Sequence, residues 1–256
     1  MANGNAFAEA VRQARTIPNL SVGCHVVLID GRPVLEASTI PSLTLSGVFR
    51  DGLKSFAARA LTGRIDAEEI CSEASAQIRK IQAVGIDVSH IDTHKHTHVF
   101  PQVLRPLLKA AKDCGIRALR NPFGPRRPFR SSDLLARPNL WTRYAEVQVL
   151  RRFAGKFRGA VQDEGFQTPD GTLGIEVTGT LDETLFHAIA NGIPEGTWEF
   201  VCHPGYNDHE LEAANTRLRE SRETELRVLT LPAAREILEQ QGIQLISYRE
   251  LADLHG

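Results

Sequence analysis

The chain has 256 residues, a hydrophobic content of 42% and a formal net charge of −1. This length can form one large domain or two small ones, and the near-neutral charge argues against a nucleic-acid-binding protein. The four cysteines are widely separated and form no C-x-x-C pair, which disfavours a cysteine-based zinc site. No apolar run reaches the ~20 residues of a membrane helix, and no signal-peptide pattern is recognisable. We therefore expect a cytoplasmic protein.

The first half of the chain predicts helices and strands in alternation. Apolar and β-branched residues indicate strands, and capping residues mark the helix ends. Asp66 is a predicted N-cap, and Gly85 and Gly115 follow predicted helix ends. The expected helices are residues 4–16, 66–84 and 101–114, and the expected strands are residues 21–29, 86–92 and 116–120.

The second half continues the alternation after a loop over residues 121–140 that is rich in Pro, Arg and Ser. Strands separated by helices imply parallel pairing, so we predict one α/β domain over residues 1–256, with its chemistry at the carboxyl ends of the strands. The expected helices are residues 140–158, 181–190 and 222–241, the last with a break near Pro232, and the expected strands are residues 173–180, 198–202 and 244–248.

The most informative segment is the run S-H-I-D-T-H-K-H-T-H, residues 89–98, which holds four of the nine histidines. Its histidines and Asp92 fall on alternate positions, so on an extended strand they would share one face. Imidazoles and a carboxylate gathered at a strand end are typical ligands of a divalent metal. A solvated histidine-rich loop is the alternative.

Strand geometry limits how many members of the run can bind one ion. Two atoms that bind one metal at ~2.1 Å lie at most ~4.3 Å apart, whereas alternate strand residues are ~6.6 Å apart. One or two histidines can therefore bind, and Asp92 is a candidate to orient a ligand imidazole. His25, in the preceding strand, is either a further ligand or a core histidine.

His203 follows a predicted strand in W-E-F-V-C-H-P-G-Y. The proline forces the chain out of the strand and the glycine permits a sharp turn. This histidine is a candidate general acid or base beside a metal-activated water. The alternative is a turn histidine that bonds to backbone.

Five segments together resemble the YdjC-like carbohydrate deacetylase family, and they span almost the whole chain in order. They are G-C-H-V-V-L, H-I-D-T-H-K-H-T-H-V-F-P, E-F-V-C-H-P-G, S-R-E-T-E-L-x-x-L-T and L-I-S-Y-R-E-L. Within the family the chain is most similar to the branch associated with hopanoid biosynthesis.

The resemblance implies a TIM-like (β/α) barrel of the glycoside hydrolase/deacetylase type. It implies Mg²⁺ or a similar ion such as Zn²⁺, bound by His25 and His94. It makes His203 the acid for the leaving amine, and we predict Asp92 as a second catalytic residue. The implied reaction removes acetyl from an N-acetylglucosamine group linked to a hopanoid lipid. A soluble chitooligosaccharide deacetylase and a non-catalytic metal- or sugar-binding protein are the alternatives.

The family's first strand carries an Asp-Asp pair that is absent from this sequence. The resemblance therefore implies a barrel whose first strand is missing, and we expect weak metal binding and impaired activity from the 256-residue form.

A basic and aromatic stretch over residues 117–158 has two interpretations. It is a solvated helix with core aromatics, or a peripheral contact with the inner membrane that suits a lipid-linked sugar.

Overall fold

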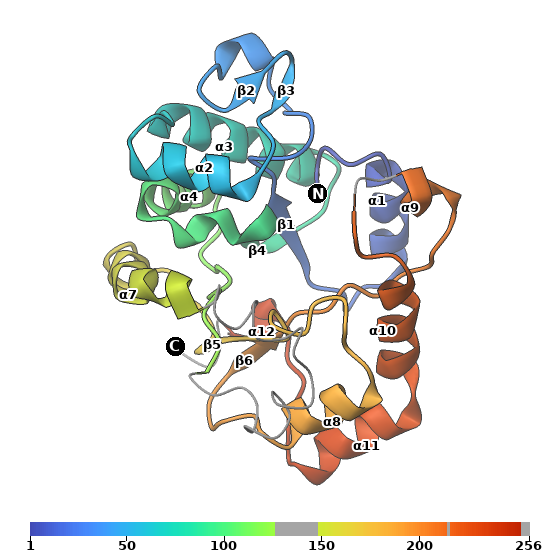
Figure 1. The fold of residues 1–256 in the computed structure, drawn as a ribbon. Coiled ribbons are helices and arrows are strands. Elements are labelled where there is room, and N and C mark those ends of the chain that lie inside the picture. Colours follow the sequence, from blue (N-terminus) through green and yellow to red (C-terminus); the bar gives the residue numbers. More distant parts are fainter. Residues whose placement is uncertain (126–147, 214–215, 252–256) are drawn as a thin grey trace. The chain divides into compact units, whose positions relative to one another are not determined.

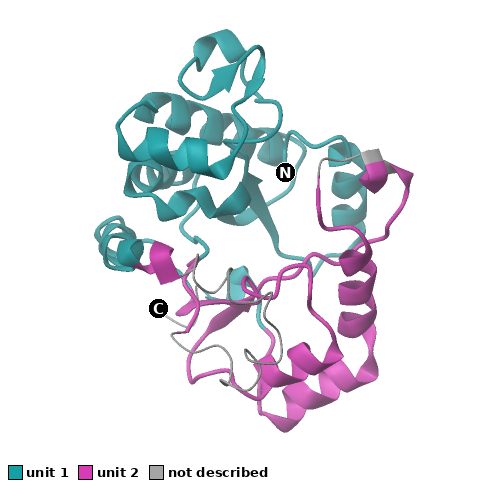
Figure 2. Ribbon diagram, viewed as in Figure 1, with its two compact units in different colours: residues 1–120, 152–168, 246–256 teal, residues 121–151, 169–245 magenta. Residues whose placement is uncertain are grey.

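The structure is a computed structural model that describes residues 1–125, 148–213 and 216–251 (Figure 1). Contacts divide the chain into two compact units (Figure 2). Unit 1 comprises residues 1–120, 152–168 and 246–256, and unit 2 comprises residues 121–151 and 169–245. The single domain expected over residues 1–256 stays a prediction.

Unit 1 is built on a parallel pair of strands, β1 (Val22–Val26) and β4 (Val88–Thr93), and their register aligns His25 with Asp92. Isolated parallel bridges then join Ile91 to Leu119 and Ala118 to Gln167. Successive segments therefore become parallel neighbours in sequence order, which confirms the predicted α/β class.

Local sequence signals set the helix boundaries of unit 1. The carboxylate of Asp66 accepts the backbone N–H groups of Glu68 and Glu69 and caps α3, as predicted. Gly85, just beyond α3, has φ 77°, which a residue with a side chain rarely adopts. Helix α4 packs against α3 (Figure 1). The helices of this unit are α1 (Phe7–Thr16), α2 (Leu53–Leu61), α3 (Ala67–Ala83), α4 (Pro101–Asp113), α7 (Ala154–Asp163) and α12 (Tyr248–Leu251).

A short hairpin and α2 were not predicted. Strands β2 (Thr44–Leu45) and β3 (Val48–Phe49) pair in antiparallel fashion around Ser46 and Gly47, both with positive φ. Two-residue strands are too short to produce an alternating pattern of apolar residues.

Unit 2 contains the parallel strands β5 (Gly171–Leu173) and β6 (Trp198–Phe200). Leu173, Leu185, Phe186 and Ile189 belong to its buried apolar core. The predicted break at Pro232 is confirmed, because Leu231 is extended with ψ 138°. The helices of this unit are α8 (Glu183–Ala190), α9 (His209–Ala213), α10 (Glu220–Thr230) and α11 (Pro232–Gln240).

Two predicted strands are wrong. The strand expected over residues 173–180 ends at Leu173, because Gly174 has φ 94° and the chain turns there. The strand expected over residues 244–248 does not form: residues 244–247 have no regular secondary structure, and α12 begins at Tyr248. The Ser247 N–H donates to the Glu250 carboxylate at 2.7 Å, which is the reciprocal half of a capping box and starts a helix.

The described strands form two-stranded sheets, and among the described residues no closed barrel is found. The TIM-like barrel therefore stays a prediction.

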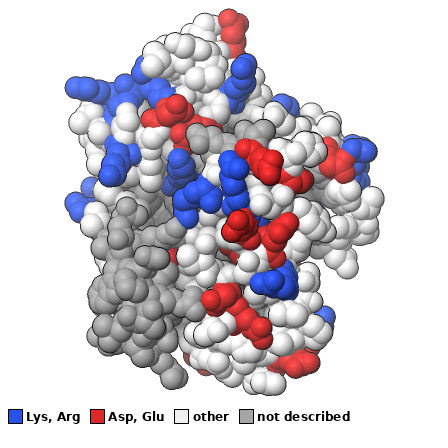
Figure 3. Space-filling view, turned by 45° about the vertical axis from the view of Figure 1, so that its right-hand side comes forward, with Lys and Arg blue, Asp and Glu red and all other residues white. Residues whose placement is uncertain are grey.

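Most of the basic and aromatic stretch lies in residues 126–147, outside the described part of the chain. On the face shown in Figure 3, acidic and basic side chains are interspersed, as the net charge of −1 suggests. Among the described helices, none is both long and apolar enough to cross a membrane.

Candidate functional site

The register of β1 and β4 brings His25 and Asp92 into direct contact. They are paired across the sheet, and His25 Nδ1 lies 2.7 Å from Asp92 Oδ2. A carboxylate on Nδ1 favours the tautomer that carries its proton there, which leaves Nε2 as the nitrogen able to bind a metal.

Asp92 is also hydrogen-bonded by the guanidinium of Arg120 and is only 4% exposed. Burial alone would raise the pKa of Asp92, but the charge and hydrogen bond of His25 and the charge of Arg120 hold it well below its usual range. The carboxylate therefore stays ionised at neutral pH. This geometry favours an orienting role, while the predicted catalytic role of Asp92 remains untested.

A sharp turn after β4 places His94 beside His25. β4 ends at Thr93, and Lys95 and His96 have left-handed backbone with φ 53° and 54°. The rings of His94 and His25 meet edge to face with centroids 5.6 Å apart. Burial, the charge of His25 and the charge of Lys95 lower the pKa of His94 to about 4. The imidazole is therefore neutral at pH 7, the form that binds metal.

The prediction that the whole run shares one strand face is wrong beyond Thr93. His98 is fully buried, and its Nδ1 lies 2.7 Å from Thr93 Oγ1 while its Nε2 lies 3.2 Å from the Arg120 carbonyl oxygen. Both ring nitrogens are thus occupied, and His98 supports the turn.

His90 is held at the start of β4. Its ring stacks on Tyr248 with centroids 3.7 Å apart, and it covers Gly23, where a Cβ would collide with the imidazole. These contacts explain the closing L-I-S-Y-R-E-L segment as a structural anchor on β4.

A carboxylate that the sequence did not suggest lies next to His94. Asp30, with φ 54°, follows β1, and its Oδ2 lies 3.9 Å from His94 Nε2 and 2.5 Å from Lys95 Nζ. The only sequence signal was the D-G pair after a strand, which indicates a turn rather than a functional residue.

His203 belongs to unit 2, just after β6. Its backbone N–H donates to the carboxylate of Glu225 at 2.5 Å, and the Gly179 N–H donates to the same side chain at 3.4 Å. Glu225 is 1% exposed and comes from the S-R-E-T-E-L segment on α10. A buried carboxylate therefore sets the position of the His203 loop.

The chemistry of His25 and His94 fits two positions of a divalent-metal site. Both are imidazoles, Asp92 orients His25, and burial keeps His94 neutral. Among the described residues, however, no group of three or more His, Cys, Asp or Glu side chains is arranged to hold a metal. A further ligand is needed to complete the site.

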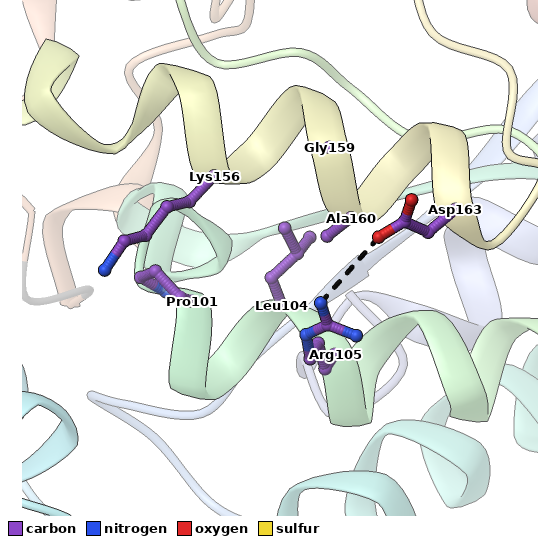
Figure 4. Close-up of a pocket in the computed structure, with 7 residues that line it drawn as sticks. All are labelled: Pro101, Leu104, Arg105, Lys156, Gly159, Ala160 and Asp163. Carbon is purple, nitrogen blue, oxygen red and sulfur yellow. Dashed lines mark ion pairs between the residues drawn. The ribbon is translucent and has the colours of Figure 1, made fainter.

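Two cavities lie away from these residues. One of about 260 Å³ is lined by α4 and α7 and contains the ion pair Arg105–Asp163 (Figure 4). The other, of about 360 Å³, is lined mainly by residues of α3 and α4. Neither contains a predicted site residue.

Comparisons with known proteins cover nearly the whole chain. The chain is 33% identical to a carbohydrate deacetylase of Geobacillus stearothermophilus over 99% of this chain and 85% of that protein. It is 29% identical to a chitooligosaccharide deacetylase of Proteus mirabilis over 98% of this chain and 85% of that protein.

A solved structure from Enterococcus faecalis, described as a cellobiose-phosphate cleavage protein, has a similar fold. The TM-score is 0.73 at 24% identity, covering 98% of this chain and 85% of that one. The family model described as YdjC-like protein matches residues 1–240. The predicted family is therefore confirmed, and the chain belongs to the YdjC-like proteins.

Proposed function

We propose that this protein is a metal-dependent carbohydrate deacetylase that releases acetate from an N-acetylglucosamine group. The observation that carries the proposal is the pair of imidazoles, His25 and His94, with the buried Asp92 behind one of them. The relatives named carbohydrate and chitooligosaccharide deacetylases support it.

In this proposal His25 and His94 hold Mg²⁺ or Zn²⁺, and Asp92 fixes the ring of His25. The bound ion would polarise the acetamide carbonyl and lower the pKa of water. Water would add to the carbonyl carbon and lose a proton, the C–N bond would break, and the amine would leave with a proton while acetate forms; the proton that water loses makes good the one given to the amine. His203 is the proposed donor of that proton. A further protein ligand would complete the set, and the Asp-Asp pair that the resemblance implies for this position is absent from this sequence.

The fold proposal is the TIM-like barrel implied by the family. It is supported by parallel strand pairing in both units. A barrel collects strand ends at one face, where such enzymes carry their chemistry.

For the substrate, we propose a hopanoid-linked N-acetylglucosamine with a peripheral contact to the inner membrane. The names of the relatives favour a soluble chitooligosaccharide at least as well. Acetate release from both substrate types in parallel distinguishes them. A preference for the soluble oligosaccharide rejects the lipid-linked substrate.

The test of the main proposal is acetate release with and without EDTA. We expect EDTA to abolish activity, and His25→Ala and His94→Ala to lower it by at least about 100-fold. The second candidate, a non-catalytic metal- or sugar-binding protein, is favoured by the incomplete ligand set. Substrate binding without acetate release would establish it.

A further inference from the structure

Unusual backbone gathers around His94. Four non-glycine residues of the described chain have positive φ, and three of them are Asp30, Lys95 and His96. The fourth, Ser46, is in a hairpin turn. Left-handed backbone is disfavoured for a residue with a side chain, and it persists where the surroundings hold it. The fold therefore places Asp30 and Lys95 against an intrinsic preference.

Two fully buried side chains of α3 hold the loop that carries Asp30, residues 27–35, by hydrogen bonds to its backbone. The carboxylate of Glu73 accepts the N–H groups of Val34 and Leu35 at 2.8 and 3.0 Å. Gln77 exchanges two hydrogen bonds with the backbone of Val27, at 2.9 and 2.7 Å. Buried polar groups that are satisfied in this way make a rigid support. The position of Asp30 is consequently a property of the fold.

The Asp30 side chain is itself well defined. It accepts the Gly52 N–H at 3.1 Å and the Lys95 ammonium at 2.5 Å, and it is 23% exposed. Among the described residues it is the acidic side chain paired with His94. A negative and a positive charge of this chain thus lie beside one predicted metal ligand.

We propose that Asp30 and Lys95 set the affinity of the histidine pair for a divalent cation, with opposite signs. The inference rests on the proposed function, since it takes His25 and His94 as the cation site. Asp30 adds negative charge next to His94 and attracts the cation, while the Lys95 ammonium neutralises part of that charge and repels the cation. Both effects are long-range and require no coordination by either residue.

The experiment measures Mn²⁺ affinity by titration calorimetry at neutral pH and low salt, on the wild type, Asp30→Asn and Lys95→Met. We expect roughly tenfold weaker binding for Asp30→Asn and roughly threefold tighter binding for Lys95→Met, with both differences shrinking at high salt. Opposite signs are diagnostic, because a purely structural ion pair is broken by either substitution and would give changes in the same direction.

Asp113→Asn is the matched control, because it removes the charge of an exposed carboxylate that pairs with Lys109 on α4. We expect it to leave Mn²⁺ affinity unchanged. Lys95 is 43% exposed, so Lys95→Met should fold and tests the sign even if Asp30→Asn does not.

Unchanged affinity in Asp30→Asn or Lys95→Met, or changes of the same sign, would overturn the inference and leave the proposed metal site intact. Absence of Mn²⁺ binding in the wild type, or binding that survives His94→Ala, would overturn both.

Discussion

Each unit has a parallel strand pair near a histidine, and in each unit a different buried carboxylate positions that histidine. The two carboxylates do so through different contacts. In unit 1, Asp92 contacts the imidazole of His25. In unit 2, Glu225 contacts the backbone N–H of His203. The first contact fixes a tautomer and a ring direction, and the second fixes where a loop lies. A histidine at the end of a strand can therefore be positioned by a contact to its ring or by a contact to its backbone.

The largest expected difference between the two units is their response to acid, which should destabilise unit 1 more than unit 2. Burial is the main cause that lowers the pKa values of His94, His96 and His98, to about 4, 3 and 4. These imidazoles are neutral in the folded protein, whereas in the unfolded chain they bind protons near pH 6.5. The unfolded state therefore binds more protons, and the free energy of unfolding falls as pH drops from about 6.5 to 4, by about 1.4 kcal/mol per pH unit for each proton.

Native-state hydrogen exchange at pH 7 and pH 5 measures this loss of stability separately for the amides of each strand. We expect the amides of β1 and β4 to lose more protection than those of β5 and β6. Equal losses in the two strand pairs would contradict the role given to the three imidazoles.

Replacing Asp92 by Asn should have the next largest effect. The substitution removes the charge that compensates the Arg120 guanidinium, which is only 14% exposed, and it weakens the hold on His25. Removing one partner of a buried ion pair costs about 3–5 kcal/mol, so the urea midpoint should fall markedly. The exposed pair Lys109–Asp113 supplies the control, since Asp113→Asn should leave the urea midpoint nearly unchanged. Similar losses from the two substitutions would mean that the Asp92 pair is not effectively buried.

Alanine at two glycines tests how rigid the two strand pairs are. At Gly174, with φ 94°, a Cβ would collide with the backbone of Val201, whereas at Gly23 it would collide with the ring of His90. We expect Gly174→Ala to cost roughly 2–4 kcal/mol and Gly23→Ala about 1–3 kcal/mol, measured by urea denaturation.

The matched double variants distinguish the two collisions. His90→Ala should recover much of the loss from Gly23→Ala, because a side chain is the obstacle, and Val201→Ala should recover little of the loss from Gly174→Ala. If the two double variants recovered similar amounts of stability, the proposed difference between a side-chain collision and a backbone collision would be wrong.

The smallest effect is expected from Glu225→Gln. Glutamine keeps one acceptor oxygen but loses the negative charge that holds two backbone N–H groups, so stability should fall by about 1–2 kcal/mol. The amide resonance of His203 should shift in an ¹H–¹⁵N spectrum, while the resonances of β1 and β4 should not. A spectrum in which the His203 amide is unmoved would show that Glu225 does not set the loop.

Helices were predicted well where their signals are local. Asp66 caps α3 through residues two and three positions away, and Pro232 divides α10 from α11 within one turn. The capping sequence S-Y-R-E at the start of α12 is equally local. The apolar residues before it nevertheless suggested a strand over residues 244–248. Apolar pattern alone does not separate short strands from helix starts.

The candidate site was predictable as residue types but not as geometry. The run directed attention to His94 and Asp92, whereas the turn at Lys95 and His96 follows from contacts that periodicity does not show. Asp30 reaches Lys95 across 65 residues, and Glu73 holds Val34 across 39. Such long-range contacts are properties of the folded chain, so one sequence could not indicate them.

The return of the chain to unit 1 has a consequence for its synthesis. Tyr248 covers His90, and Arg249 pairs with Asp87 at 3.3 Å, yet all of unit 2 lies between these partners in the sequence. The ribosome has synthesised β1, β4 and all of unit 2 before it adds residues 246–251. Until then the first residues of β4 lack their cover, so unit 1 completes its packing only after unit 2 has been translated.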